Sequence, residues 1–183
     1  MKKISHGSGV FSLDGFFRKD EADKYISMAR EMQYEEAPIQ TGEGEELFKS
    51  IRNNDRVIFD DESLAVELFD RCKEYLPQRY DIYWQSIGFN ERFRLYRYTK
   101  DQYFKWHYDG AYSRSSREQS KLSFLIYLNE DYTGGSTEFK GFEFKPKQGA
   151  ALFFPHQILH QGATISSGTK FVLRTDVMYI KLA

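Results

Sequence analysis

Only one cysteine, Cys72, stands in the 183 residues, so the chain cannot form an internal disulfide. It lies in "ELFDRCKEYL" among apolar residues at helical spacing, which favours burial over a reactive thiol. No segment approaches the ~20 apolar residues of a membrane-spanning helix. The N-terminal "MKKISHGSGVF" has two lysines with no apolar run behind them, unlike a secretory signal. These absences predict a cytoplasmic protein without a membrane partner.

Net charge is also nearly absent, with a formal value of −1 and an isoelectric point near 6.4. This balance argues against a broadly basic surface and against nucleic acid as the partner. Hydrophobic residues make up 40% and charged residues 29%, which indicates a soluble globular protein, and the length suits one domain spanning residues 1–183. Aromatic residues are abundant at 17%, which favours a β-rich fold with a ring-lined interior.

The first half of the chain predicts two helices among short strands. We expect a strand at "GVFSLDGF", a helix from about Asp20, and a second helix from about Glu62 to Leu76 that Pro77 ends. Between the helices, "PIQTGEGEEL" is rich in glycine and acid and predicts a mobile, solvated loop. The polar cluster "RNNDR" follows, and a role of Arg52, Asn53, Asn54 or Arg56 in lining a substrate site stays open.

From about Phe93 the hydrophobic period changes to two. Short aromatic or β-branched runs are separated by turn residues, as in "RFRLYRY", "YFKWHYD", "LSFLIYL", "TEFKGFEF", "GAALFF" and "KFVLRTDVMYI". Six or more strands after two helices predict an α+β, mainly β fold, either a sandwich or an open barrel with helices packed on one sheet. Residues 1–90 would supply helical support and edge strands, and residues 91–183 the core that carries the site.

A candidate metal site lies in "YFKWHYDGAY". On a strand, His107 and Asp109 project from one face about 6–7 Å apart, so both can converge on one point. The third ligand would come from "HQILH", which offers His156 and His160. Two histidines and one carboxylate are the usual ligands of non-haem Fe(II) in oxygenases, although zinc accepts them as well.

Lys170 begins the strand "KFVLRTDVMY" and shares a face with Arg174. A buried cation left unpaired there would cost several kcal/mol, and a bound carboxylate would satisfy it. Tyr98 and Tyr127 lie on neighbouring strands and could donate to the same carboxylate. A cosubstrate with one carboxylate for Lys170 and a 2-oxo acid for the metal fits this pattern. For Arg174, a role in the pocket and a structural ion pair both stay open.

Three segments together resemble the prolyl 4-hydroxylase branch of the Fe(II)/2-oxoglutarate-dependent dioxygenases: "NERFRLYRYTKDQYFKWHYDG", "LIYLNEDYTGGSTEF" and "GAALFFPHQILHQGATISSGTKFVLRTDVMY". The resemblance covers about residues 90–183 and rests on H-x-D, Y-L-N, G-G-x-T, a distal histidine and a basic residue ten positions later. "RNNDRVIFDDESLA" is similar to that branch as well. The chain departs from it at "TKDQ", where many relatives have Pro-Gly before the Gln; this changes a turn and touches no ligand.

The resemblance implies a double-stranded β-helix, or jelly roll, with iron in its open mouth. Its implied iron ligands are His107, Asp109 and His160. His160 is preferred because its separation from Lys170 matches the family, which leaves His156 as a loop or substrate-side residue. The cosubstrate 2-oxoglutarate would be bound by the cofactor-binding candidates Lys170, Tyr98, Tyr127 and Arg174.

The implied reaction is hydroxylation of an unactivated C–H bond with O2, which releases succinate and CO2, and ascorbate would keep the iron reduced. The branch suggests a prolyl residue in a peptide or protein as substrate, although fold alone does not set the substrate. A free amino acid or another small molecule remains the alternative. Two other classes stay open: a non-catalytic, cupin-like metal-binding module and a zinc hydrolase.

Overall fold

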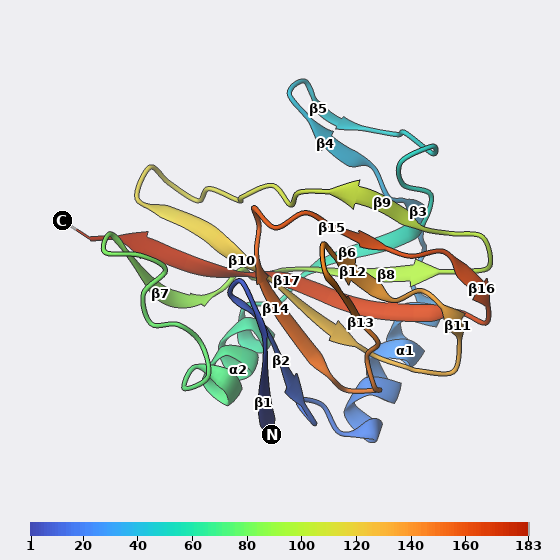
Figure 1. Cartoon of the computed structure of the whole chain (residues 1–183), viewed down its shortest axis with the longest axis horizontal. Coiled ribbons are helices and arrows are strands. Elements are labelled where there is room, and N and C mark those ends of the chain that lie inside the picture. Colours follow the sequence, from blue (N-terminus) through green and yellow to red (C-terminus); the bar gives the residue numbers. More distant parts are fainter. Residues whose placement is uncertain (183) are drawn as a thin grey trace.

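The computed structural model describes residues 1–182, most of which lie in antiparallel β-sheets and two helices (Figure 1). The larger sheet has nine strands in the order β1-β2-β14-β10-β17-β8-β6-β3, with β7 paired to the C-terminal half of β17. Its strands are β1 (Lys2–Gly7), β2 (Val10–Asp14), β3 (Glu35–Glu36), β6 (Asp55–Asp60), β7 (Trp84–Phe89), β8 (Arg92–Tyr98), β10 (Glu118–Tyr127), β14 (Ala151–Pro155) and β17 (Lys170–Lys181).

The smaller sheet has four strands in the order β13-β12-β15-β9. They are β9 (Phe104–His107), β12 (Thr137–Phe139), β13 (Phe142–Phe144) and β15 (His160–Gly162). Two further pairs flank the sheets: β4 (Ile39–Thr41) with β5 (Gly44–Glu46), and β11 (Thr133–Gly134) with β16 (Ile165–Ser167).

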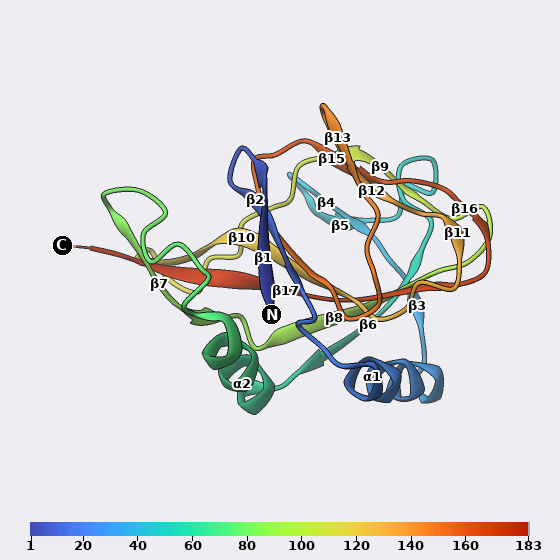
Figure 2. The ribbon, with the colours of Figure 1, turned by 60° about the horizontal axis from the view of Figure 1, so that its bottom comes forward.

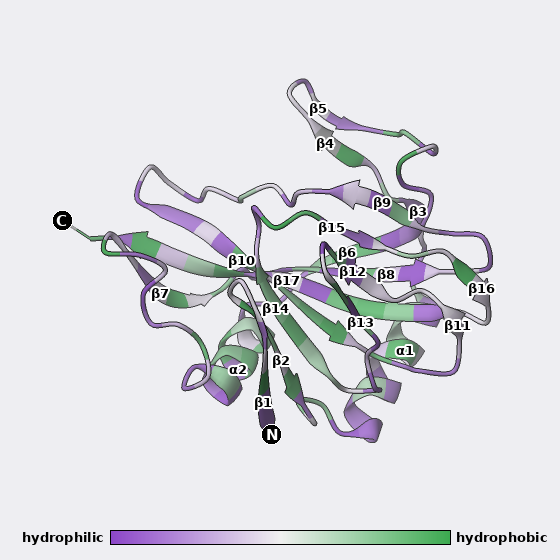
Figure 3. Cartoon of the chain, viewed as in Figure 1, coloured by the Kyte–Doolittle hydropathy of each residue, from purple (hydrophilic) through white to green (hydrophobic). Residues whose placement is uncertain are grey.

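The larger sheet is covered on both faces. Helices α1 (Lys19–Glu31) and α2 (Glu62–Cys72) lie on one side of it, and the smaller sheet lies on the other (Figure 2). One apolar cluster fills the space towards the helices, and a second, rich in Tyr and Phe, fills the space between the sheets. Double coverage explains why β14 is apolar along its length instead of alternating (Figure 3). The predicted α+β, mainly β fold is confirmed.

Both helices begin where the sequence predicts. The Glu21 carboxylate accepts the Arg18 backbone N–H (2.8 Å) at the start of α1, and the Asp61 carboxylate accepts the Leu64 N–H (2.8 Å) at the start of α2. The predicted end of the second helix at Leu76 is wrong, because α2 ends at Cys72. Two turns follow, in which the Tyr75 N–H donates to the Cys72 carbonyl and the Leu76 N–H to the Lys73 carbonyl. Pro77 disfavours helical geometry at Leu76.

Cys72 itself is fully buried, and its thiol donates to the Leu68 carbonyl (3.2 Å). Burial raises the pKa of this thiol to about 12, so it is inert at neutral pH. The predicted packing role is confirmed. Within residues 1–182, neither helix is long and apolar enough to cross a membrane.

The predicted mobile loop in "PIQTGEGEEL" is wrong, because this segment forms the β4–β5 hairpin that projects beside β9 (Figure 1). A buried arginine outside the segment holds the hairpin in place. The Arg56 guanidinium binds the Glu35 carboxylate (2.7 Å) and the Glu45 carboxylate (2.8 Å). The acidic side chains therefore serve a specific ion-pair cluster, which the local composition alone does not reveal.

Candidate metal centre

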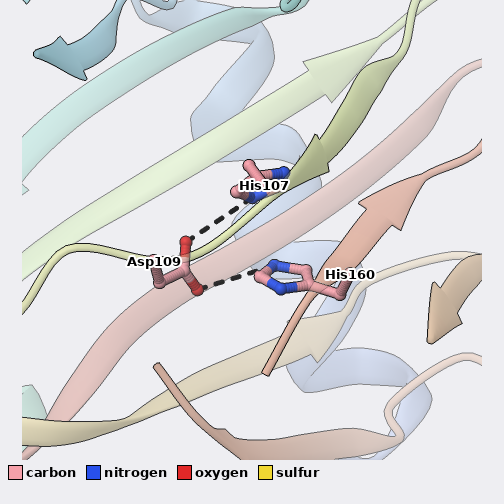
Figure 4. A group of neighbouring side chains, drawn as sticks. All are labelled: His107, Asp109 and His160. Carbon is pink, nitrogen blue, oxygen red and sulfur yellow. Dashed lines mark ion pairs between the residues drawn. The ribbon is translucent and has the colours of Figure 1, made fainter. Parts of the chain in front are cut away.

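Three side chains meet in the space between the two sheets (Figure 4). His107 on β9 pairs directly with His160 on β15, and their ring centroids lie 4.2 Å apart. The Nε2 atoms of His107 and His160 each lie 3.6 Å from a different oxygen of Asp109. The predicted convergence of these three residues on one point is therefore confirmed.

The backbone conformation that places Asp109 differs from the predicted one. Strand β9 ends at His107, so the same-face argument for a continuous strand is wrong for Asp109. The backbone N–H of Asp109 instead donates to the His156 carbonyl (3.0 Å), which ties the segment after β9 to the turn after β14. A tertiary hydrogen bond thus aims the carboxylate.

Each histidine is held in one tautomer. His107 Nδ1 lies 2.6 Å from the Lys105 carbonyl, and His160 Nδ1 lies 2.9 Å from the Ile158 carbonyl. Because a carbonyl only accepts, both Nδ1 atoms carry the proton and donate. The Nε2 lone pairs then face the carboxylate, and this arrangement of donors fits a divalent transition metal such as Fe(II).

Asp109 is anionic at neutral pH even though it is buried. Burial alone would raise its pKa, but the positive charge of Arg174 holds the pKa well below its usual range. Arg174 Nη1 lies 2.9 Å from Oδ1, and the Ser123 hydroxyl donates to Oδ2 (2.5 Å). Arg174 therefore lies beside the candidate metal site and makes an ion pair with Asp109.

His156 lies behind the carboxylate. Its Nδ1 is 2.9 Å from the Ser123 hydroxyl and its Nε2 is 2.9 Å from the Ser120 hydroxyl, so both ring nitrogens are engaged. His156 lies in the turn after β14, so the prediction of a loop residue is confirmed, and its side chain is buried. "HQILH" thus supplies one metal-facing histidine, His160, and one histidine that supports Asp109 through Ser123.

Lys170 is buried in the same cavity that the metal-facing side chains line. Its Nζ donates to the Gly135 carbonyl (2.6 Å) and lies 5.6 Å and 5.1 Å from the ring centroids of Tyr98 and Tyr127. Within residues 1–182 no carboxylate pairs with this ammonium, and burial lowers its pKa to about 7. Lys170 is therefore not an exposed lysine at the end of its strand. An unpaired buried ammonium fits the far carboxylate of 2-oxoglutarate.

The Gly134–Gly135 turn carries the Gly135 carbonyl that accepts the hydrogen bond from Lys170. Both residues have positive φ, +78° and +65°, and a Cβ on Gly135 would lie 2.2 Å from a side-chain carbon of Ile165. The two glycines therefore form a tight turn. Next to it, the Tyr127 hydroxyl forms a hydrogen bond with the hydroxyl of Thr137 (2.6 Å), which lines the cavity.

Two aromatic side chains that line the cavity, Phe104 and Tyr96, were not predicted from the sequence as site residues. Phe104 stacks on His107 with centroids 3.4 Å apart and an interplanar angle of 13°. Tyr96 also lines the cavity; burial would raise its pKa, but the nearby charges of Arg52 and Arg174 lower it to about 8. Period-two spacing placed Tyr96 and Phe104 on strands but carried no information on their neighbours.

Residues 93–175, which hold all of these metal-facing and lysine-side residues, match the family model described as the 2OG-Fe(II) oxygenase superfamily. This segment is therefore similar to that superfamily, in line with the sequence resemblance, and it spans less than half of the chain.

Among curated proteins, the chain is 25% identical over 199 residues to Prolyl 4-hydroxylase 13 of Arabidopsis thaliana, an alignment that covers 92% of this chain and 70% of the plant protein. It is 28% identical over 149 residues to a protein of Acanthamoeba polyphaga mimivirus that is provisionally named a prolyl 4-hydroxylase. That alignment covers 68% of this chain and 57% of the viral protein, so the chain spans little more than half of this relative.

Solved structures share the fold. The viral collagen prolyl hydroxylase of Paramecium Bursaria Chlorella virus-1, in complex with 2-oxoglutarate, superposes with a TM-score of 0.64 at 22% identity, covering 95% of this chain and 97% of that one. A prolyl hydroxylase of Trichoplax adhaerens with a hypoxia-inducible factor peptide gives a TM-score of 0.67 at 14% identity, covering 93% and 83%. The likeness confirms the predicted jelly-roll core.

Proposed function

We propose that the protein is an Fe(II)- and 2-oxoglutarate-dependent dioxygenase that hydroxylates an unactivated C–H bond and releases succinate and CO2. One observation carries this proposal: the two-histidine, one-carboxylate centre and the buried ammonium of Lys170, which has no carboxylate partner among the described residues, line a single cavity. A metal-binding module without catalysis has no use for the buried cation, and a hydrolase needs no second carboxylate-binding group.

The roles of the residues follow from their contacts. His107 and His160 offer Nε2, and Asp109 offers a carboxylate oxygen, to the iron. Iron with its cosubstrate supplies the O2 chemistry. Lys170 binds the far carboxylate of 2-oxoglutarate, and the bound anion restores the charge of the ammonium that burial disfavours.

The rings of Tyr98 and Tyr127 lie beside the Lys170 ammonium and exclude water around that ion pair. Arg174 faces the other end and fixes Asp109. Because the cosubstrate would be held at both ends, its 2-oxo acid is oriented towards the metal before the primary substrate binds.

As the primary substrate we propose a prolyl residue in a peptide or protein. The support is the naming of the relatives as prolyl 4-hydroxylases and the peptide bound to the Trichoplax enzyme. Ascorbate is proposed as the reductant that rescues the iron after unproductive turnover. Near-neutral charge favours a peptide over nucleic acid as the partner.

The test begins without O2. Purified protein loaded with Fe(II) is titrated with 2-oxoglutarate, and a weak visible charge-transfer band is expected on binding. On admission of air, succinate is assayed, and candidate prolyl peptides are searched by mass spectrometry for one added oxygen atom. A metal-binding module would give neither band nor succinate. A zinc hydrolase would keep its activity without O2, and either result would overturn the proposal.

A further inference from the structure

Within residues 1–182, three cationic side chains are buried: Arg52, Arg56 and Lys170. Arg56 is neutralised by two glutamates of the hairpin region, and Lys170 is assigned above to the cosubstrate. Arg52 is only 6% exposed, yet no carboxylate of the described residues lies within ion-pair distance of it. Arg52, like Lys170, is therefore a buried cation that an anionic ligand would neutralise.

The neighbours of Arg52 fix its position without neutralising its charge. Its Nε donates to the Asn54 side-chain oxygen (2.8 Å) and its Nη1 to the Pro38 carbonyl (3.2 Å), both of which are neutral acceptors. Its Nη2 is buried and has no partner among the described residues. The guanidinium lies over the rings of Tyr96 (4.6 Å) and Phe104 (4.4 Å). A planar, immobilised cation with an unused donor is suited to binding a carboxylate.

Arg52 lines a hollow of about 300 Å3 that also includes Asn53, Lys100 and Gln102. Acidic side chains border it too, but two of them already have cationic partners. Glu36 pairs with Lys49, and Asp55 pairs with Arg97, while the remaining acid, Asp101, is exposed.

This hollow lies next to the metal centre. Phe104 stacks on His107 at 3.4 Å and contacts the Arg52 guanidinium at 4.4 Å. Two planar groups cannot occupy the same face of one ring at these distances, so Arg52, Phe104 and His107 form a continuous stack. An anion on Arg52 would be separated from the metal ligand by a single aromatic ring. A carboxylate bound there would belong to the residue that is oxidised or to its immediate neighbour.

We propose that Arg52 binds a carboxylate of the primary substrate, so that the enzyme prefers substrates with an acidic group in, or directly beside, the oxidised residue. This inference rests on the proposed function and names its substrate class. The carboxylate has two possible sources with the same chemistry: an acidic side chain in a peptide, or the α-carboxylate of a free amino acid.

The test uses full-length protein loaded with Mn(II) and 2-oxoglutarate, with binding measured by calorimetry without O2. The probes are the end-blocked peptide Gly-Ala-Pro-Ala-Gly, the same peptide with Glu before or after Pro, and free proline. For the wild-type protein, a Glu peptide or free proline is expected to bind at least about tenfold more tightly than the Ala peptide. The better acidic probe identifies the source of the carboxylate.

Two variants test Arg52. Arg52→Gln removes the charge, and Asn54→Asp leaves Arg52 in its ring stack but places a carboxylate beside its Nε. Both are expected to abolish the preference for the acidic probe, so the second variant remains informative if the first does not fold. Lys24→Gln, which removes an exposed charge that does not line this hollow, is expected to keep the preference.

The inference is overturned if wild-type protein binds acidic and neutral probes equally or binds none of them, or if both Arg52→Gln and Asn54→Asp keep the acidic preference. Failure of the proposed function is distinguishable from these results. In that case the wild-type protein with Fe(II) would show no charge-transfer band with 2-oxoglutarate, whichever peptide is present.

Discussion

His107 and His160 stand directly opposite each other in the β9–β15 pair, and their Nε2 atoms address different oxygens of one carboxylate. The register of two short strands therefore sets the geometry of the centre. A shift of one residue in either strand would turn its imidazole to the other face of the sheet. The strand register that forms the smaller sheet therefore also places the two histidines of the candidate metal centre.

Replacing His160 with Ala is expected to abolish retention of Fe(II), because it removes one of the two Nε2 donors. His156→Ala is the matched control in the same segment and is expected to keep one iron per chain, with affinity lowered about 10–100-fold since Asp109 loses support through Ser123. Iron content after gel filtration checks both. Loss of iron in the His156 variant alone would reverse the assignment.

Replacing Lys170 with Met is expected to weaken 2-oxoglutarate binding at least about tenfold and to leave Fe(II) affinity nearly unchanged, because a charge-assisted hydrogen bond is lost far from the ligands. The charge-transfer titration measures the first effect and metal titration the second. Lys121→Met, which removes a partly buried lysine over the Trp84 ring, serves as control. An equal loss of both affinities would show that Lys170 has a structural role.

Binding of 2-oxoglutarate is expected to depend on pH through Lys170. Burial lowers the pKa of this ammonium to about 7 in the free protein, and a bound carboxylate raises it. Below pH 7 the free site is already protonated, so affinity is constant. Above pH 7 the site must take up a proton to bind, and affinity falls by up to about tenfold per pH unit. A flat profile in wild-type protein above pH 7 would contradict this.

The same lowered pKa affects folding. The unfolded lysine keeps its proton up to its ordinary pKa near 10.5, whereas the folded one loses it near 7. The unfolded state therefore binds more protons between these values, and this residue makes the ligand-free protein more stable as pH rises from 7 to 10. Denaturant unfolding of wild-type protein and of the Lys170→Met variant isolates the contribution, which should vanish in the variant.

Replacing Arg174 with Met is expected to lower Fe(II) affinity about 10–100-fold, because the guanidinium fixes one Asp109 oxygen at 2.9 Å. Without that charge the pKa of Asp109 rises, so metal binding should also become more sensitive to acid. Arg174→Lys keeps the charge and should recover part of the affinity. Metal titration at two pH values measures both effects, and unchanged binding in the Met variant would refute the positioning role.

Cys72 is expected to resist thiol reagents in the native protein and to react fully once the protein is unfolded. It is fully buried in α2, and its raised pKa leaves almost no thiolate at neutral pH. Absorbance after addition of a thiol-specific reagent, with and without denaturant, checks this. Rapid native labelling would mean that α2 opens frequently.

Strongly patterned elements were predictable from sequence, and weakly patterned ones were not. Strands β8 and β17 are dense in aromatic and β-branched residues, so local pattern finds them. β15 consists of His160–Gly162, whose sequence HQG has no apolar period; it is a strand because β9 and β12 pair with it. Tertiary pairing of this kind cannot be read from one segment.

The residues of the candidate site likewise divide into those that the sequence predicts and those that it does not. His107 and Asp109 were singled out by residue type and spacing, His160 was chosen over His156 through the family resemblance, and a burial argument singled out Lys170. The partner of Arg174 was not predictable, because it depends on the segment after β9 that carries Asp109 back against β17. The support of Asp109 by Ser123 and His156 likewise joins residues from β10 and from the turn after β14, and no sequence period links them.

The hydrogen bond from Lys170 to Gly135 has a consequence for selectivity among cosubstrates. The ammonium is tethered to a rigid diglycine corner and enclosed by tyrosine rings, so it cannot swing towards a shorter ligand or retreat from a longer one. The distance from the Lys170 ammonium to His107, Asp109 and His160 therefore restricts the length of the dicarboxylic acid that can bind at both ends. We expect oxaloacetate, which is one methylene shorter than 2-oxoglutarate, not to reach both ends of the cavity. We expect 2-oxoadipate, which is one methylene longer, not to fit between them.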